Sequence, residues 1–488
     1  MTTLSPADPS TAEARTLFIA GTWQAADDAF ERFDPAALDR STGRFAAASE
    51  AHVEAAYTAA SAAQPAWGAL PAPARAEVLR RAADHLESRT EAAARRLTLD
   101  MGKCIRDARG EVLRSVSILR YFAGELLQPV GETYASTDPS TMLLTVEQPL
   151  GVVCAITPWN FPFAIPTWKL APALGFGNSV VWKPAEAASG SAVMLTESLA
   201  AGGLPDGVLN LITGSGGRLS GALTGDRRLA AITFTGSGGV GSRLRQAVAD
   251  RNVKVQLELG GKNPAIVLAD ADLADAAVQV TRGAMLGTGQ RCTATSRVFV
   301  ERTVASEFEQ LLRRQISELV VGDPLDERTD LGPVAFGEQL ETVSEYLKLA
   351  RGEQAEVFTA GDLSRENTCF MAPALLTGVE PHSRLMREEI FGPVLVLKAV
   401  DDLEAALAAA NDTEFGLSSA VFTRDIGKAM RFIRATESGV VHINRETAGV
   451  EPHVPFGGIK GSSSMSREQG KAARQFFTTT KTVYIRSV

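Results

Sequence analysis

The stretch AAITFTGSGGVGSRLRQAVADRNVKVQLEL, residues 230–259, has the pattern that decides the fold. Apolar runs at 230–235 and 254–259 flank a stretch of helical character at 240–249. A strand, a helix and a second strand in this order are typical of a unit whose two strands run parallel in one sheet. The stretch therefore predicts an α/β fold in which helices cover a parallel sheet.

The alternation continues toward the N-terminus. Apolar runs occur at 141–146, 151–156, 179–182 and 209–212, and residues 191–200 again have helical character. Parallel sheets bind ligands beyond the carboxyl ends of their strands. We therefore expect functional residues in the loops that follow these runs.

The region before the sheet is mainly helical. Residues 51–124 have helical periodicity, and Pro71 and Pro73 break the run and restart a helix. Apolar residues recur at helical spacing near the end of this region, at Val112, Val116, Leu119 and Phe122. We expect that helix to bury one face. Residues 18–23 predict a short strand and a turn.

A second alternating set follows residues 258–263, ELGGKN, a glycine-rich break that we interpret as a seam between two domains. Its apolar runs lie at 265–268, 297–300, 394–400 and 418–422. A chain of 488 residues is too long for one ordinary core. Two or three domains are therefore expected.

Composition and charge argue against several classes of function. The net charge of −8 is spread along the chain without a basic patch that contains aromatics, so we expect no nucleic-acid partner. There is no window of about 18 apolar residues, so we expect no membrane span. The polar residues 1–15 lack the apolar core of a secretory signal.

The cysteines suit a reducing compartment. None forms a CxxC pair or has a histidine at metal-ligand spacing, so we expect neither a disulfide framework nor a metal site. The four are Cys104, Cys154, Cys292 and Cys369. We therefore expect a cytoplasmic location.

Cys292 is the first candidate for chemistry. In the segment GQRCT, residues 289–293, it is surrounded by small and polar residues, which suggests exposure. Thiolate attack on a carbonyl needs such a setting. A lone cysteine can equally be a small core hydrophobe. This segment alone leaves both interpretations open.

A glutamate and an asparagine are further candidates. Glu258 lies between leucines at the end of a predicted strand, where low polarity would raise its pKa toward that of a general base. Asn160 lies in the loop ITPWNFP, residues 156–162, where a rigidly held amide can donate to an oxyanion. The alternatives are an edge-strand glutamate that faces solvent and a turn stiffened by proline.

Two segments suit a nucleotide. FTGSGGVG, residues 234–241, runs from a strand into a helix, and its glycines would let a pyrophosphate approach the helix N-terminus. It is not the GxGxxG fingerprint, and many such segments are only turns. Lys183 and Glu186 follow another strand and could bind ribose hydroxyls, or be ordinary surface charges.

Together, and in this order, these motifs resemble the aldehyde dehydrogenase superfamily over residues 18–485. The tracts that carry the resemblance are TPWNFP (157–162), FTGS (234–237), ELGGK (258–262), GQRC (289–292), EEIFGP (388–393) and PFGG (455–458). The resemblance implies oxidation of an aldehyde to a carboxylic acid through a thioester on Cys292. Relatives that transfer the acyl group to coenzyme A lack the glutamate found at Glu258, so hydrolysis is expected.

The resemblance also implies roles for individual residues. Cys292 is the expected nucleophile, and Glu258 activates water. Asn160 and the Cys292 backbone N–H stabilise the oxyanion, while Lys169 and Glu468 match a proton path to the base. The expected cofactor-binding residues are Ile156, Thr157, Trp159, Lys183, Glu186, Gly236, Ser237, Leu259, Glu389 and Phe391.

The expected cofactor is NAD, with NADP as the alternative, because the charge of Glu186 would repel a 2′-phosphate. Within the cofactor set, Ser237 matches the pyrophosphate contact, and Lys183 and Glu186 match the contacts to the adenosine ribose. Glu389 and Phe391 match the residues that position the nicotinamide ribose and ring.

The implied fold has two parallel-sheet, Rossmann-like domains and a small β oligomerisation flap. The cofactor-binding domain comprises 1–138 and 151–260, and the catalytic domain comprises 261–470. The flap comprises 139–150 and 471–488 and reaches a neighbouring subunit. Exposed strands of this kind are an aggregation hazard in a monomer, so we expect a homodimer or homotetramer.

The substrate is a separate question. Three tracts resemble α-ketoglutaric semialdehyde (2,5-dioxopentanoate) dehydrogenases: GQRCTATSR (289–297), AGVEPHVPFGG (448–458) and SREQG (466–470). Related semialdehyde enzymes often have arginines eight residues after the oxyanion asparagine and six before the nucleophile. This chain has Trp168 and Leu286 there instead.

A buried carboxylate needs a cationic partner. The expected candidates are Arg120, Arg291 and Arg445. A semialdehyde is the first expectation, on the three tracts. A medium-chain or aromatic aldehyde is the alternative, on the apolar pocket residues.

Two other classes of protein are weighed against this interpretation. A catalytically inactive homologue would keep the fold, but the joint presence of Cys292, Glu258 and Asn160 argues against it. A cysteine hydrolase without a cofactor would need a histidine base. The histidines, none in a recognised pairing, are His52, His85, His382, His442 and His453.

Overall fold

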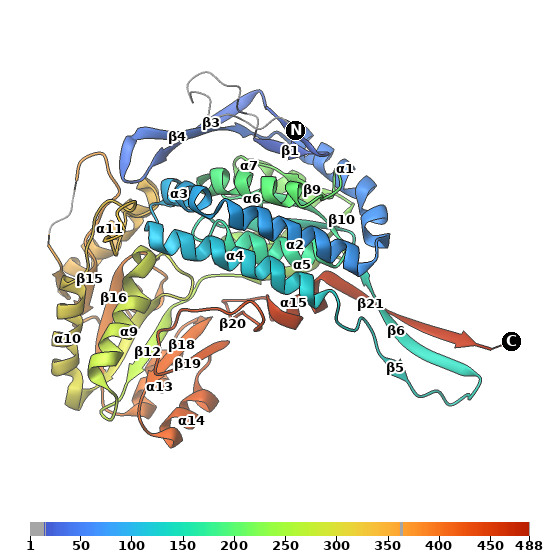
Figure 1. The fold of residues 1–488 in the computed structure, drawn as a ribbon. Coiled ribbons are helices and arrows are strands. Elements are labelled where there is room, and N and C mark those ends of the chain that lie inside the picture. Colours follow the sequence, from blue (N-terminus) through green and yellow to red (C-terminus); the bar gives the residue numbers. More distant parts are fainter. Residues whose placement is uncertain (1–13, 15, 362–364, 488) are drawn as a thin grey trace.

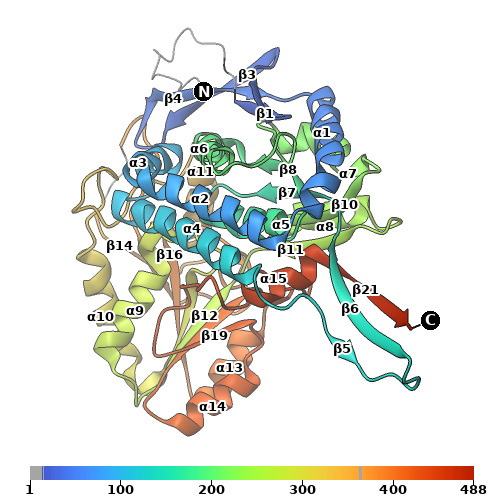
Figure 2. The ribbon, with the colours of Figure 1, turned by 45° about the vertical axis from the view of Figure 1, so that its right-hand side comes forward.

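Two seven-stranded sheets organise the chain in the computed structural model (Figures 1 and 2). The structure describes residues 14, 16–361 and 365–487, so most of the segment predicted to lack a secretory signal is outside it. Among the described residues, no helix has both the length and the apolar character needed to cross a bilayer.

The first sheet has the strand order β11-β10-β7-β8-β9-β1-β2. The first five of these strands run parallel, and β1 and β2 form an antiparallel hairpin at the edge. The bounds are β1 Leu17–Ile19, β2 Thr22–Gln24, β7 Val152–Thr157, β8 Ser179–Pro184, β9 Leu209–Leu211, β10 Leu229–Thr235 and β11 Lys254–Glu258. The parallel sheet predicted from the alternating runs is confirmed.

Helices cover both faces of this sheet (Figure 1). Their bounds are α1 Glu50–Ala69, α2 Ala72–Ser88, α3 Thr90–Met101, α4 Ile105–Glu125, α5 Ala164–Gly175, α6 Ser189–Ala201, α7 Gly216–Gly225 and α8 Gly238–Ala247. Pro71 separates α1 from α2 and Pro73 lies in the first turn of α2, where proline costs no hydrogen bond.

Alternate residues of β7 explain why both faces must be covered. Val153 and Ala155 pack with α2–α6 in one core, whereas Val152 and Cys154 pack with α1, α7 and α8 in another. Side chains of a strand point to opposite faces in turn, so a strand that is apolar throughout needs two cores.

The second sheet has the order β14-β15-β16-β13-β12-β18-β19 and is parallel except for β14. Its strands are β12 Asn263–Val267, β13 Thr295–Glu301, β14 Glu356–Thr359, β15 Ala374–Thr377, β16 Val394–Val400, β18 Ser418–Phe422 and β19 Val440–Ile443. The helices around it are α9 Leu273–Met285, α10 Ala305–Ser317, α11 Gly337–Gly352, α12 Arg384–Arg387, α13 Leu403–Asn411 and α14 Ile426–Ala435.

Three smaller sheets complete the described chain. β3 (Asp28–Asp34) pairs with β4 (Ala37–Ala47), and β17 (Phe415–Gly416) pairs with β20 (Ile459–Lys460). The third sheet contains β5 (Thr133–Tyr134), β6 (Thr141–Pro149) and β21 (Thr478–Arg486).

The sheet of β5, β6 and β21 extends away from the rest of the chain in both views (Figures 1 and 2). β21 pairs antiparallel with the whole of β6, from Thr478 opposite Pro149 to Arg486 opposite Thr141. Apolar side chains on it are exposed, including Met142, Tyr484 and Ile485. α15 (Gly470–Phe477), which precedes β21, instead packs into the core of the first sheet through Phe476 and Phe477.

Candidate active site

Residues from both sheets meet where β11 ends and β12 begins. Only residues 259–262 join the two strands, so the carboxyl end of the first sheet lies against the second sheet. Two cavities open at this seam, of about 270 Å³ and 310 Å³. Cys292 and Ile165 line both of them, so Cys292 stands where the cavities meet.

The loop before Cys292 has an unusual backbone. Gly287, Thr288 and Gly289 have φ values of +65°, +58° and +67°, which place three consecutive residues in the left-handed region. A Cβ at Gly289 would overlap the carbonyl oxygen of Gly392, so only glycine fits there. These constraints fix the position of the residues that follow.

Asn263 anchors the other side of this loop. Its Nδ2 donates to the carbonyl oxygens of Cys292 (2.8 Å) and Ala294 (2.9 Å). Its Oδ1 accepts from the backbone N–H of Ser418 at 3.0 Å. One buried amide therefore ties the nucleophile loop to β12 and β18. The sequence analysis missed this residue, and its only signal was a position directly after the ELGGK tract.

Cys292 differs from the other cysteines. It is partly exposed, whereas Cys104, Cys154 and Cys369 are buried. Low-polarity surroundings, and next the nearby carboxyl groups of Glu389 and Glu258, raise the pKa of its thiol to about 12. A cavity-facing thiol of this kind fits the nucleophile interpretation better than the core interpretation.

Asn160 is buried and held on two sides. Its Nδ2 donates to the backbone carbonyl oxygen of Gln290 at 3.0 Å, and the backbone carbonyl oxygen of Asn160 accepts from Lys103 Nζ at 2.9 Å. Lys103 also pairs with the carboxylate of Glu111. An amide nitrogen has two hydrogens, so one N–H of Asn160 is left for a ligand in the cavity that Asn160 shares with Cys292.

Glu258 is buried at the end of β11 and does not face solvent. Its Oε1 accepts from Ser463 Oγ at 2.9 Å, and its Oε2 has no partner among the described residues. Burial, and next the charge of Glu468, raise the pKa of Glu258 well above its usual value. Glu258 is not among the described residues that line the two cavities.

Lys169 and Glu468 form a buried ion pair close to Glu258. Lys169 Nζ also donates to Thr233 Oγ1 at 3.0 Å, which in turn donates to Gln256 Oε1 at 3.0 Å. Lys169 and Glu468 thus meet near the expected base, although 299 positions separate Lys169 from Glu468 in the sequence.

The smaller cavity contains most of the residues expected to bind the cofactor. Those that line it are Trp159, Gly236, Ser237, Leu259, Glu389 and Phe391. The ring of Trp159 lies edge-on to the ring of Phe391, with centroids 5.4 Å apart. Glu389 accepts from the backbone N–H of Gly261 at 3.0 Å, and burial raises the pKa of Glu389 to about 7.

Ser237 is the N-cap residue of α8, but its side chain makes no capping bond to the described residues. Gly238 and Gly239 follow it, and the space around their Cα atoms is open. The N-terminus of α8 is therefore accessible, and unpaired N–H groups there attract anions.

The other four expected cofactor residues lie on neighbouring strands. Ile156 and Thr157 end β7, while Lys183 lies at the end of β8 and Glu186 follows it. β7 lies between β8 and β10, which leads into α8, so these residues share one edge of the sheet with Ser237. Burial lowers the pKa of Lys183 to about 8, although Glu186 opposes the shift.

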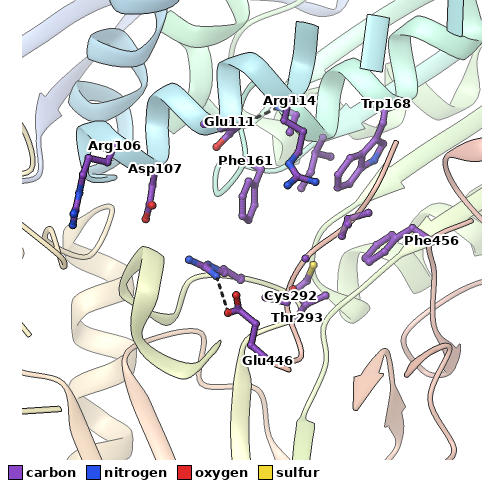
Figure 3. A pocket seen from close by; sticks show the side chains of 17 residues that line it. Arg106, Asp107, Glu111, Arg114, Phe161, Trp168, Cys292, Thr293, Glu446 and Phe456 are labelled. Carbon is purple, nitrogen blue, oxygen red and sulfur yellow. Dashed lines mark hydrogen bonds and ion pairs between the residues drawn. The ribbon is translucent and has the colours of Figure 1, made fainter. Parts of the chain in front are cut away.

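The larger cavity also has Cys292 in its lining (Figure 3). Trp168 and Arg291, both expected near the substrate, line it together with Phe161 and Phe456. Leu286 does not line it among the described residues. Leu286 packs against the core of the second sheet instead, and the left-handed turn that follows it separates it from Arg291, the next residue along the chain that lines the cavity.

The expected cationic candidates separate in the structure. Arg291 lies in the cavity, with its guanidinium 3.8 Å from the carboxylate of Glu446. Arg120 instead pairs with Asp84 and Glu87 on the surface of α2 and α4. Arg445 is exposed and is not among the described residues that line the cavity.

Two arginines of α4 in this cavity were missed by the sequence analysis, Arg106 and Arg114. The available signal was the helical spacing of Asp107, Glu111 and Arg114, which places these residues on one face of α4. Within the described part of the chain, no group of three metal-ligating side chains occurs.

Comparisons with known proteins show the family of the chain. The model of the aldehyde dehydrogenase family matches residues 23–483. The chain is 42% identical to an α-ketoglutaric semialdehyde dehydrogenase of Bacillus subtilis, covering 96% of this chain and 97% of that protein. It is 39% identical to an α-ketoglutarate semialdehyde dehydrogenase of Haloferax volcanii, over 96% of this chain and 98% of that protein.

A solved structure shares the fold. The betaine aldehyde dehydrogenase of Staphylococcus aureus, crystallised in complex with NAD+, superimposes with a TM-score of 0.93 at 31% identity. The match covers 96% of this chain and 94% of that chain. With the family model matched over nearly the whole chain, the expected two-sheet architecture present and the expected residues gathered around Cys292, this chain belongs to the aldehyde dehydrogenase family.

Proposed function

We propose that this chain uses NAD+ to oxidise a carboxylate-bearing semialdehyde, such as α-ketoglutaric semialdehyde, to the acid. The observation that carries the proposal is the position of Cys292 between two cavities. One cavity has groups suited to a dinucleotide, and the other has aromatic walls and arginines. The names of the relatives from Bacillus subtilis and Haloferax volcanii support this substrate class.

The residues of the smaller cavity fit a dinucleotide. The open N-terminus of α8 and the uncommitted hydroxyl of Ser237 suit a pyrophosphate. Thr235 Oγ1 is also buried without a partner among the described residues. Lys183 and Glu186 suit the hydroxyls of a ribose, and the carboxylate of Glu186 disfavours a 2′-phosphate, so NAD is preferred to NADP.

NAD+, when held by the residues of the smaller cavity, would supply the hydride acceptor. The Cys292 thiol transfers its proton to solvent, and its Sγ forms a bond to the aldehyde carbon while the carbonyl electron pair moves to oxygen. Asn160 Nδ2 and the Cys292 backbone N–H donate to this oxyanion. As the carbonyl forms again, the hydrogen on that carbon leaves as hydride and a thioester on Cys292 remains.

Glu258 acts in the second half of the reaction. Its carboxylate rotates from Ser463 toward the thioester and accepts a proton from water, whose oxygen attacks the acyl carbon. The C–S bond breaks, the sulfur regains a proton, and the free acid leaves. The raised pKa of Glu258 makes its carboxylate a better proton acceptor than an exposed glutamate. The charges of Lys169 and Glu468 act on Glu258, and Lys169 continues to Thr233, so this buried polar chain is the proposed path for the proton.

We also propose the division into domains. Residues 1–138 and 151–260 form the cofactor-binding domain, 261–470 form the catalytic domain, and 139–150 with β21 form the flap, whereas the part of 471–488 that lies in α15 packs with the first sheet. The exposed apolar side chains of β6 and β21 support contact with another subunit, in a homodimer or homotetramer. The free cysteines suit a cytoplasmic, reducing location.

The test is kcat/KM for α-ketoglutaric semialdehyde, succinic semialdehyde, hexanal and benzaldehyde, with NAD+ and NADP+. Turnover is followed by the absorbance of the reduced nicotinamide, which also separates a dehydrogenase from a hydrolase or an inactive homologue. We expect the semialdehydes and NAD+ to be preferred and Cys292→Ala to have no activity while still binding NAD+. If kcat/KM is about tenfold higher for the neutral aldehydes, a difference of roughly 1.4 kcal/mol, the apolar and aromatic lining determines the substrate. The semialdehyde proposal is then wrong.

A further inference from the structure

Two of the three arginines that line the larger cavity have a carboxylate close by. Arg106 donates to Asp330 at 2.8 Å and to the carbonyl oxygen of Thr329 at 3.1 Å. Arg291 lies 3.8 Å from Glu446. A cation that already has a carboxylate close by gains less from a further anion, so neither arginine is the best anchor for a substrate.

Glu111 is also satisfied. It pairs with Lys103, and its Oε1 accepts from the backbone N–H groups of Phe163 at 2.9 Å and Ala164 at 3.2 Å. Its negative charge is therefore balanced within the wall of the cavity. Asp107 also lines the cavity, but it lies beside Arg106 at the end away from Trp168 (Figure 3).

Arg114 is the exception among the three arginines of this cavity. It lines the same cavity as Cys292 and forms no hydrogen bond or ion pair with any described residue. Figure 3 shows its guanidinium reaching from α4 into the cavity, next to Trp168 and on the side that faces Cys292. An unpaired, partly buried guanidinium among aromatic rings loses hydration without gaining a partner, which favours an anionic ligand.

We propose that Arg114 binds the distal carboxylate of the substrate and thereby selects semialdehydes over neutral aldehydes. The planar guanidinium offers two parallel N–H donors to a carboxylate. Phe161, Trp168 and Phe456 contact the carbon chain between this carboxylate and the aldehyde, which Cys292 receives. This inference rests on the proposed function, since it assigns the residue that recognises that substrate class.

The experiment measures kcat and KM of the wild type, Arg114→Gln and Arg114→Lys with α-ketoglutaric semialdehyde, succinic semialdehyde and hexanal. For Arg114→Gln we expect kcat/KM for both semialdehydes to fall on the order of tenfold to a hundredfold, mostly through KM. For hexanal, kcat/KM should change less than about threefold, since hexanal has no carboxylate that Arg114 could bind. Arg114→Lys keeps the charge and should recover part of the loss.

Arg120→Gln is the matched control, because Arg120 lies on the same helix but pairs with Asp84 and Glu87 on the surface. Arg120→Gln should leave kcat and KM for all three substrates unchanged. An equal fall for hexanal and the semialdehydes in Arg114→Gln, or no fall for either, would overturn the assignment of Arg114. If Arg114→Gln does not fold, Arg114→Lys decides, since an unchanged semialdehyde-to-hexanal ratio and unchanged KM in that variant also overturn it.

The two proposals fail in different ways. A wild type that prefers hexanal refutes the semialdehyde function itself. A wild type that prefers semialdehydes, with a ratio of semialdehyde to hexanal that Arg114→Gln does not alter, leaves that function intact and refutes only the role of Arg114.

Discussion

Replacing Asn160 by alanine removes the only side-chain donor that we assign to the oxyanion. In the structure one N–H of its amide is bound to the carbonyl oxygen of Gln290 at 3.0 Å, and the other is free for the substrate. The side chain is only 3% exposed, so this second N–H acts in a region of low polarity. There, a fixed dipole stabilises developing charge far better than it would in water.

The expected magnitude has two parts. Loss of one oxyanion donor lowers kcat by about 10²–10³-fold, or roughly 2.7–4 kcal/mol of transition-state stabilisation. Loss of the bond to Gln290 destabilises the fold by about 1 kcal/mol, and by up to about 3 kcal/mol if the carbonyl finds no water. A domain with a stability of about 5–15 kcal/mol remains folded after this loss. The variant should therefore be folded and slow.

The assay compares the pre-steady-state formation of reduced nicotinamide with NAD+ affinity and thermal unfolding. Asn160→Ala should slow the first turnover and the steady state alike, because the oxyanion forms in the acylation half of the reaction. NAD+ binding should change little. Asn210→Ala is the matched control, since Asn210 is also fully buried and donates to a backbone carbonyl, that of Gly207 at 2.7 Å, but lies in β9 outside both cavities.

The reasoning fails if Asn160→Ala retains kcat within about threefold of the wild type, less than the tenfold that 1.4 kcal/mol represents. It also fails if Asn210→Ala loses as much kcat as Asn160→Ala at a similar loss of stability. In that second case the effect would come from a loosened fold and not from a missing donor.

Three further predictions concern carboxylates. Glu258→Gln cannot accept the proton of water, so stopped-flow absorbance should show one burst of reduced nicotinamide per site and a steady state slower by about 10²–10⁴-fold; equal loss of burst and steady state would contradict the role in hydrolysis. Glu186→Ser removes the charge that repels a 2′-phosphate, so the NAD+/NADP+ ratio of kcat/KM should fall about tenfold, as 1.4 kcal/mol implies, and an unchanged ratio would count against this contact. The pKa of Glu389 is about 7 in the folded chain against 4.5 in the unfolded one, so folded protein holds a proton that unfolded protein has lost. Relative to Glu389→Gln, the wild type should lose unfolding free energy as pH rises from about 4.5 through about 7. Denaturant titrations at several pH values measure this. The same pH dependence of the unfolding free energy in both proteins would refute the shift.

The sequence was a good guide where local pattern decides local structure. Apolar runs that alternate with helical stretches require strands with two covered faces, and β7 shows this directly, with Val153 in one core and Val152 in the other. Pro71 separates two helices because it cannot continue the first one. The tracts around Cys292, Glu258 and Asn160 were equally local, so their resemblance to the family could be read without any knowledge of contacts.

Direction and pairing of side chains depended on the tertiary structure. Leu286 was expected near the substrate on its spacing from Cys292, but three left-handed residues intervene, so Leu286 packs against α9 and its sheet. Counting residues predicts direction only in a regular element. The position of the cationic candidates also depended on packing: Arg291 lines the cavity, whereas the charge of Arg120 is taken up by Asp84 and Glu87.

The sequence by itself determined that the chain is an α/β protein with two parallel sheets and which short tracts carry chemistry, because both follow from spacing along the chain. Only the tertiary structure decided that Asn263 holds the Cys292 loop, that Lys169 meets Glu468 across 299 positions, and that Arg114 is left without a partner in the cavity. The periodicity of a helix shows which residues share a face. Which residues contact that face depends on how segments from both sheets pack together, and the sequence of a single segment does not determine this packing.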